Sequence, residues 1–332
     1  MMSQLKGATV LVTGGAGFIG SNLCEHLLDN HIAVVCLDNF ATSRRENVMP
    51  FIENPLFTLI EGDICDETTC HHAMKGVTHV LHQAALGSVP RSINNPLATH
   101  MTNTTGFLNV LIAARDAGVK RFVYAASSST YGDSTSFPKV EDVIGKPLSP
   151  YAVTKLVNEL YADVFSKTYG FHCIGLRYFN VFGRRQDPNG AYAAVIPKFV
   201  MQFMNYESPI INGTGDYSRD FTYIDNVIQA NMLALTTSSE QALNQVYNVA
   251  YGQRATLNEM ATALKIALAE FDPKIADVEV IHGPNRPGDI PHSLASIEKA
   301  RTLLGYDPKF DFPTGLKVAT KWYFENLHVY VN

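Results

Sequence analysis

Short apolar runs rich in β-branched residues alternate with longer mixed segments over about the first 180 residues of the chain. The candidate strands cover residues 8–14, 33–39, 57–63, 79–85, 121–127 and 172–178. They are nearly continuous in apolar residues, as strands covered on both faces are. Helical patterns lie between them, and Gly118 and Gly170 mark the ends of those at 103–117 and 151–169. This alternation predicts an α/β fold with a doubly wound parallel sheet.

The pattern changes after about residue 180. Glycine and proline cluster at residues 183–190, 208–216 and 283–291, with shorter candidate helices and strands between them. We therefore expect a first domain over residues 1–180 and a smaller α/β lobe over residues 181–332. The cleft between two such parts is the usual place for a ligand.

Composition excludes several classes of protein. The 332 residues are 46% hydrophobic with a net charge of −5, which disfavours a protein that grips nucleic acid. No apolar run approaches the roughly 20 residues that span a bilayer, and the N-terminus lacks the pattern of a signal peptide. The 5 scattered cysteines do not predict a disulfide framework, so we expect a cytoplasmic protein. Cys65, Cys70, His71 and His72 have no partner cluster elsewhere, so we expect no metal site.

A glycine-rich segment, TGGAGFIG, lies at the end of the first candidate strand, and three of its four glycines have the spacing of a dinucleotide-binding turn. Gly14, Gly17 and Gly20 allow a tight turn, close approach of the backbone to a pyrophosphate, and close packing of helix on strand. The helix that begins here offers free N–H groups and a partial positive charge to phosphate. The spacing predicts a Rossmann-type dinucleotide site. Because a glycine motif alone is not specific, the next strand supplies the second observation.

Asp38 ends the second candidate strand, where a carboxylate accepts hydrogen bonds from the adenine ribose. The same charge would repel a 2′-phosphate, which favours NAD over NADP. Arg44 and Arg45 lie close by in the sequence and leave NADP as an alternative. Asp63, with Ile64, ends the third candidate strand, where it would meet the adenine edge.

A candidate catalytic set lies near the middle of the chain. Tyr151 and Lys155 are four positions apart in a helical pattern, which places them on one face. A free tyrosine has a pKa near ~10, too high for a base at neutral pH, and a neighbouring ammonium would lower that pKa. Ser127 ends the fifth candidate strand, at the edge where α/β sheets hold ligands. Its hydroxyl would orient the substrate oxygen during proton transfer.

Six motifs occur together in one order: TGGAGFIG, SSSTYG, YAVTK, RYFNVFG, RDFTYIDN and RPGD. In this combination the chain resembles the extended short-chain dehydrogenases that process nucleotide sugars, over about residues 7–325. Within that group it is most similar to the bacterial UDP-N-acetylglucosamine 4-epimerases. The resemblance implies an NAD-binding Rossmann domain, a nucleotide-sugar-binding lobe, and NAD that stays tightly bound and is regenerated in each cycle.

The resemblance also implies roles for individual residues. Ser127, Tyr151 and Lys155 would form the catalytic triad. NAD would contact Gly14, Gly17, Phe18, Ile19, Gly20, Asp38, Asn39, Ser43, Arg44, Asp63, Ile64, Gln83, Ala84, Tyr151, Lys155 and Val181. The UDP-hexose would contact Gly87, Ser88, Ser127, Ser128, Tyr151, Asn180, Ala194, Val195, Lys198, Arg219, Arg286, Asp289 and Ser293. Members of the group usually form homodimers, here through the helices at 103–117 and 151–169, although burial inside the monomer explains these helices as well.

The segment after Ser127 bears on the reaction. Related dehydratases carry carboxylates there, because expelling water requires an acid and a base. Residues 127–131 are Ser-Ser-Ser-Thr-Tyr, without a carboxylate. Elimination is therefore disfavoured. The prediction is a 4-epimerase, in which Tyr151 takes the C4 hydroxyl proton, NAD takes and returns the hydride, and a 4-keto sugar turns over in between.

Ser293 bears on the size of the sugar. Epimerases restricted to UDP-glucose and UDP-galactose usually carry a tyrosine at the matching position, and a serine leaves room for a 2-acetamido group. The prediction is interconversion of UDP-N-acetylglucosamine and UDP-N-acetylgalactosamine, with UDP-glucose and UDP-galactose also accepted. The alternatives are a surface serine without consequence, a UDP-N-acetylhexosaminuronic acid as substrate, an NAD(P)-dependent nucleotide-sugar oxidoreductase, and a non-enzymatic NAD(H)-sensing module.

Overall fold

The computed structural model describes residues 2–189, 194–285 and 291–327. Within these ranges the main sheet has 7 parallel strands in the order β11-β6-β5-β4-β1-β2-β3. This sheet confirms the predicted Rossmann-type α/β fold. Its strands are β1 (Thr9–Thr13), β2 (Ala33–Asp38), β3 (Phe57–Glu61), β4 (His79–His82), β5 (Arg121–Ser127), β6 (Cys173–Tyr178) and β11 (Gln245–Val249).

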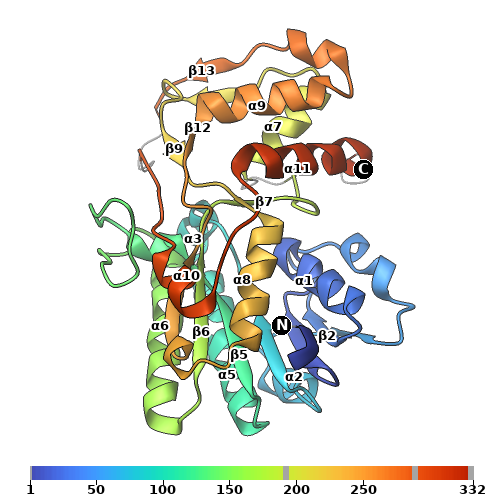
Figure 1. Cartoon of the computed structure of the whole chain (residues 1–332), viewed down its shortest axis with the longest axis vertical. Helices are drawn as coiled ribbons and strands as arrows, with labels where there is room; N and C mark the ends of the chain where they lie inside the picture. Colours follow the sequence, from blue (N-terminus) through green and yellow to red (C-terminus); the bar gives the residue numbers. More distant parts are fainter. Residues whose placement is uncertain (1, 190–193, 286–290, 328–332) are drawn as a thin grey trace.

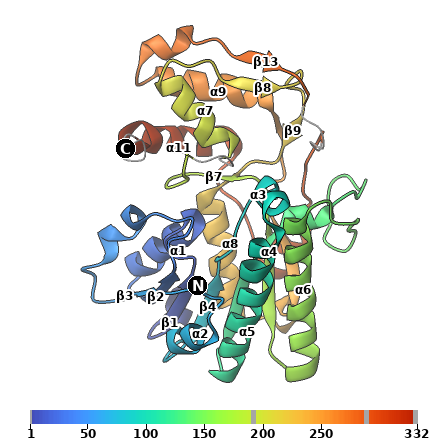
Figure 2. The same cartoon turned by 180° about the vertical axis from the view of Figure 1, so that it is seen from behind.

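Helices cover both faces of this sheet (Figure 1, Figure 2). Along β1, Val10 and Val12 belong to the core cluster that includes α1 and α8, whereas Leu11 belongs to the cluster with α2, α5 and α6. Alternate residues thus face opposite layers, which explains why the strands are apolar throughout. The helices are α1 (Phe18–Asp29), α2 (Glu67–Ala73), α3 (Val89–Asn94), α4 (Pro96–His100), α5 (Phe107–Asp116), α6 (Pro150–Tyr169) and α8 (Ile224–Thr236), with a π-helix (Met101–Gly106) before α5.

Helix α6 begins and ends where its sequence dictates. The Ser149 side chain accepts a hydrogen bond from the amide of Ala152, and Pro150 occupies the first turn. Gly170 closes the helix in the left-handed conformation, with φ of 64°. These caps fix Tyr151 in the first turn of the helix, beside the end of β5.

The smaller lobe stacks on the end of the sheet where β6 leads into β7 (Figure 1). Two of its short strands, β7 (Val181–Phe182) and β10 (Thr222–Tyr223), pair in parallel at the junction. The other described elements of this half are α7 (Val195–Met204), β8 (Ile210–Asn212), β9 (Ser218–Arg219), β12 (Ala255–Thr256), α9 (Leu257–Ala269), β13 (Ile281–Gly283), α10 (Glu298–Leu304) and α11 (Phe312–Asn326). No helix in the described ranges combines the length and apolarity that crossing a membrane requires.

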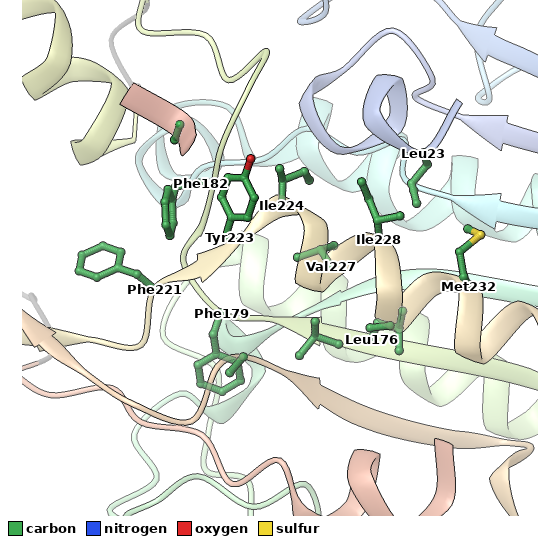
Figure 3. Packing of buried hydrophobic residues seen from close by; sticks show 14 of the residues in the cluster. Leu23, Leu176, Phe179, Phe182, Phe221, Tyr223, Ile224, Val227, Ile228 and Met232 are labelled. Atoms are coloured by element: carbon green, nitrogen blue, oxygen red, sulfur yellow. The ribbon is translucent and has the colours of Figure 1, made fainter. Parts of the chain in front are cut away.

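The two parts share one hydrophobic core. At the junction the rings of Phe182, Phe221 and Tyr223 lie together, and Val227 extends the packing along α8 (Figure 3). The centroids of Phe182 and Tyr223 are 5.6 Å apart. Although α8 and β11 follow residue 180, α8 packs on the main sheet and β11 is one of its strands. Residues 181–332 therefore supply part of the first domain as well as the smaller lobe.

Candidate active site

The three predicted catalytic residues meet at the end of β5. Ser127 is the last residue of this strand, and its side chain hydrogen-bonds that of Tyr151 in α6. Lys155 lies one turn further along α6, with Nζ 6.0 Å from the centroid of the Tyr151 ring. Its Nζ donates a hydrogen bond of 2.8 Å to the carbonyl oxygen of Ala125. The spacing of Tyr151 and Lys155 therefore produces the predicted shared face.

Burial controls the proton affinities of this pair. It raises the pKa of Tyr151 above its usual value, and the hydrogen bond from Ser127 opposes this increase only in part. Lys155 is only 2% exposed. Burial lowers its pKa to about 8, while the nearby charge of Glu159 acts in the opposite direction. The expected lowering of the Tyr151 pKa by Lys155 is not found, because burial dominates and the ammonium donates to the Ala125 carbonyl.

Ser127 is held in place by Ser129. Its Oγ accepts a hydrogen bond of 3.1 Å from the Ser129 amide and lies 2.9 Å from the Ser129 hydroxyl oxygen. A serine hydroxyl has two acceptor lone pairs and one proton. Ser127 can therefore accept from the Ser129 amide and still donate to Tyr151, or to an oxygen that replaces it. Ser129 was not predicted as a site residue, and Ser128 begins the short 3₁₀ helix that follows β5.

The glycine loop has the conformation that a dinucleotide needs. Gly14 has a φ of +66°, and a Cβ there would lie 2.7 Å from the amide of Ala84. A Cβ at Gly20 would lie 2.1 Å from the carbonyl oxygen of Gly14. Helix α1 follows Gly17, and its N-terminus has no side-chain cap within the described chain. The first amides of α1, at Phe18 and Ile19, thus fit a pyrophosphate.

Asp38 organises the adjoining loop. Its carboxylate accepts hydrogen bonds from the amides of Ala16 and Phe40, both at 2.9 Å, and from Ser43 Oγ at 2.6 Å. The side chain is 7% exposed. A carboxylate has about four acceptor positions, so capacity for a ribose hydroxyl remains. Arg44 of the same loop forms an ion pair with Asp187.

Asp63 and Asn39 form the next wall of this region. Asn39 Nδ2 donates a 3.0 Å hydrogen bond to Asp63. Burial alone would raise the pKa of Asp63, but hydrogen bonds from Cys65 and Asn39 outweigh it and the net shift is downward. The carboxylate form is therefore favoured. Ile64 beside it is 4% exposed.

The segment after β4 carries the residues predicted to touch both ligands. Tyr178 OH donates to Gln83 Oε1 at 3.1 Å. Ser88 has a φ of 89°, uncommon for a residue other than glycine, and caps α3. Its neighbour Gly87 is exposed.

Asn103 is a positioning residue that the sequence did not predict. It is 1% exposed within the π-helix, a type of helix that often lies at functional sites. Its Oδ1 accepts from the Leu86 amide at 2.7 Å, and its Nδ2 donates to the Leu86 carbonyl at 3.1 Å. Nδ2 also contacts Thr154 Oγ1 at 3.2 Å. Asn103 thus joins the segment after β4 to the helix that carries Tyr151 and Lys155.

Three predicted sugar-side residues are brought together around β9. Asn180, with a φ of 33°, donates from Nδ2 to the carbonyl oxygen of Asp220 at 3.1 Å. The guanidinium of Arg219 donates to the carbonyl oxygens of Ser218 and Pro291 at 3.0 and 3.3 Å. The amide of Ser293 also donates to the Ser218 carbonyl oxygen, at 3.0 Å.

Asp220 is a buried residue that supports this region, and the sequence did not predict it as a site residue. It is 0% exposed. Its carboxylate accepts hydrogen bonds from the amides of Tyr251, Gly252 and Ala295 at 3.2 to 3.3 Å. Burial raises the pKa of Asp220 to about 7, although these hydrogen bonds act in the opposite direction. One buried carboxylate therefore joins β9 to two loops of the smaller lobe.

The remaining predicted residues lie in the second half of the chain. Val181 begins β7, and Ala194 and Val195 stand at the start of α7, with Lys198 exposed in its first turn. Arg286 and Asp289 lie outside the described residues. Within residues 2–189, 194–285 and 291–327, no three or more His, Cys, Asp or Glu side chains are grouped as metal ligands.

A Rossmann sheet with a glycine-rich turn, an acid at the end of β2, and a serine–tyrosine–lysine set defines a dinucleotide-dependent enzyme of the short-chain dehydrogenase type. The model of the NAD dependent epimerase/dehydratase family matches residues 10–250. The chain belongs to this family, and its cofactor is NAD.

Individual proteins are similar to this chain over nearly its whole length. A UDP-glucose 4-epimerase of Mycolicibacterium smegmatis is 32% identical over 315 residues, which cover 94% of this chain and 97% of the relative. The structure is similar to that of a UDP-N-acetylglucosamine 4-epimerase from Methanobrevibacter ruminantium in complex with UDP-N-acetylmuramic acid (TM-score 0.89, 37% identity, 96% and 98% coverage). It is also similar to the NAD complex of a Thermus thermophilus UDP-glucose 4-epimerase (TM-score 0.84, 32% identity, 96% and 99% coverage).

Proposed function

We propose that the protein interconverts UDP-N-acetylglucosamine and UDP-N-acetylgalactosamine by epimerisation at C4, and that it also accepts UDP-glucose and UDP-galactose. The observation that carries the proposal is the Ser127–Tyr151–Lys155 set at the end of β5, without a carboxylate in residues 127–131. Such a set can remove and return one proton, but it lacks the second acid and base that elimination requires.

In this proposal the protein itself transfers one proton, between the C4 hydroxyl of the sugar and Tyr151. Tyr151 exchanges its Ser127 partner for the C4 hydroxyl of the sugar, and Ser127 donates to the same oxygen. NAD, when bound, supplies a reversible acceptor for the C4 hydrogen. Burial disfavours the Tyr151 phenolate in the structure. In the proposal, the Lys155 ammonium 6.0 Å from the ring centroid stabilises that phenolate once it forms during turnover. The 4-keto sugar then turns about its bond to the diphosphate, and Tyr151 returns the proton on the other face.

The sugar side supports anchoring at the diphosphate. Arg219 carries a guanidinium fork that matches phosphate oxygens, and Asn180 lies beside the same strand. Ser293, bonded through its backbone to β9, has a small side chain that leaves space for a 2-acetamido group. Arg286 and Asp289 retain their proposed roles on the basis of the sequence.

We also propose a homodimer formed through α5 and α6. Val153, Leu160 and Val164 of α6 are 48%, 57% and 51% exposed, at spacings that place them along one side of the helix. Burial inside the monomer does not explain these three side chains. Packing against a second copy would remove them from water.

The decisive experiment is to incubate the purified protein with UDP-N-acetylglucosamine, without added cofactor, and to identify the sugars after acid hydrolysis. The proposal expects N-acetylgalactosamine to form with no net NAD(P)H consumption. Tyr151→Phe should lower the rate by about 10³-fold or more, whereas Tyr161→Phe on the same helix should not. Turnover of UDP-N-acetylglucosaminuronate but not of UDP-N-acetylglucosamine would establish the uronic-acid alternative instead.

A further inference from the structure

Two arginines follow the acid that faces the adenine ribose in Rossmann enzymes. Asp38 holds its loop through Ser43, and Arg44 and Arg45 come directly after that serine. Guanidinium groups at this location are what a 2′-phosphate on the ribose requires. The positions of these two side chains therefore decide which dinucleotide the site prefers.

Arg44 is engaged by the other half of the chain. Its Nε lies 2.8 Å from Asp187 Oδ2, and its Nη2 lies 3.3 Å from Asp187 Oδ1. This is the two-pronged geometry that orients a guanidinium most firmly. The side chains of Arg44 and Asp187 are 25% and 35% exposed, so the pair is partly shielded from solvent. Asp187 itself is fixed, because Oδ1 also accepts the Asn189 amide at 2.8 Å.

Arg45 is engaged by the neighbouring strand. Its Nη2 lies 2.6 Å from Glu61 Oε1, and its guanidinium carbon lies 4.1 Å from the centroid of the Phe40 ring. Glu61 is the partner of Asp38 in the register of β2 and β3. The side chains of Arg45 and Glu61 are 55% and 56% exposed, so this pair is weaker than the first.

We propose that Asp187, assisted by Glu61, determines the preference for NAD over NADP by occupying the guanidinium groups that would bind a 2′-phosphate. An incoming phosphate would meet the charge of Asp38 and two arginines already neutralised by carboxylates. To pair with Arg44 it would have to displace Asp187 from both contacts. Specificity for the cofactor thus depends on a residue of the loop after β7, far in sequence from the nucleotide-binding turn.

The test uses the full-length protein, incubated with equal concentrations of NAD and NADP until its bound dinucleotide has exchanged to a constant composition. After removal of free ligand and denaturation, the released dinucleotides are quantified by chromatography. Asp187→Asn should raise the ratio of bound NADP to bound NAD by about tenfold. Glu61→Gln should raise the ratio by about twofold to threefold, as expected for an exposed pair. Glu298→Gln, which removes an exposed ion pair with Arg301 in α10, serves as the matched control and should leave the ratio unchanged.

The double variant Asp187→Asn/Arg44→Leu identifies the mechanism. If Asp187 acts through Arg44, the double variant returns to the ratio of Arg44→Leu alone. An unchanged ratio in Asp187→Asn, or an equal gain in the double variant, overturns the proposal. Circular dichroism melts establish that each variant is folded, and the ratio measured for Glu61→Gln decides the question if Asp187→Asn does not fold. The assay does not depend on the sugar substrate, so its outcome is independent of the proposed epimerase activity.

Discussion

The cofactor side and the sugar side of the site are built in different ways. On the cofactor side, Gly14 and Gly20 bring backbone against backbone, and Asp38 ends a strand of the main sheet. On the sugar side, Asn180, Arg219 and Ser293 lie on short segments whose contacts run through backbone carbonyls and the buried Asp220. Close packing of backbone on backbone is thus particular to the cofactor side, whereas the sugar side is held by hydrogen bonds. This difference suits the tightly bound NAD and the turning sugar of the proposed mechanism.

The most damaging change should be on the closely packed side. Gly20→Ala places a Cβ 2.1 Å from the Gly14 carbonyl oxygen, so the turn must open. We expect loss of bound NAD, a fall in activity of about 10³-fold or more, and destabilisation by about 1–3 kcal/mol. The NAD content of the purified protein measures the effect. Gly118→Ala, which has open space but a φ of +68°, should retain NAD at a cost of about 1 kcal/mol. Normal NAD content in Gly20→Ala would remove the distinction between the two sides.

The sugar side should respond in specificity rather than in cofactor content. Ser293→Tyr fills the space assigned to the acetamido group, so kcat/KM for UDP-N-acetylglucosamine should fall by about 100-fold. The value for UDP-glucose should change by no more than a few fold, and bound NAD should be unaffected. Ser293→Ala, which adds no bulk, is the control. Equal losses on both sugars would show that Ser293 does not contact the 2-position.

Lys155 lies between the two sides, and burying its charge should lower the free energy of unfolding of the protein. Its pKa falls from 10.5 to about 8 on folding, which corresponds to about 3 kcal/mol. A lowered pKa stabilises the folded state fully above pH 10.5, and this contribution is lost as the pH falls through about 8. Lys155→Met should therefore raise the free energy of unfolding at pH 7 by about 1–3 kcal/mol, while abolishing turnover.

Denaturant titrations at several pH values test this prediction. The advantage of Lys155→Met should shrink as the pH rises from 7 towards 10.5, since wild-type Lys155 then becomes neutral in both states. Lys167→Met, at an exposed position of the same helix, should show no such trend. A variant that is less stable than the wild type at pH 7 would mean that the hydrogen bond to Ala125 outweighs the cost of burying the charge.

The smallest effect on activity is expected at Asp220. Asp220→Asn keeps the shape of the side chain but replaces an acceptor oxygen with an amide that also donates. The loops at Tyr251, Gly252 and Ala295 should loosen, at a cost of about 1–3 kcal/mol. The KM for the UDP-sugar should rise, with NAD content and the spectrum of bound NAD unaltered. A loss of NAD in this variant would indicate that the two sides are coupled.

The sequence predicts the cofactor side better than the sugar side, for a physical reason. The turn at residues 14–20 and Asp38 belong to consecutive local elements, so their separation along the chain determines how close they lie in the fold. Asn103 and Asp220 act through residues distant in sequence, and no local pattern predicts such contacts. Strand β11 was likewise not predicted, since it joins the sheet only by pairing with β6. The pKa of Tyr151 depends on burial, which residue spacing does not report.

The shared core at the junction (Figure 3) also has a mechanical consequence. The chain leaves the main sheet after β6, returns through α8 and β11, and returns again at α10, which packs on both. Several chain connections and one continuous set of aromatic rings therefore join the smaller lobe to the main sheet. A wide hinge-like opening of the two parts would have to break that packing. We therefore expect the two parts to stay together during turnover, so that the rotation required by the proposed mechanism is confined to the bound sugar.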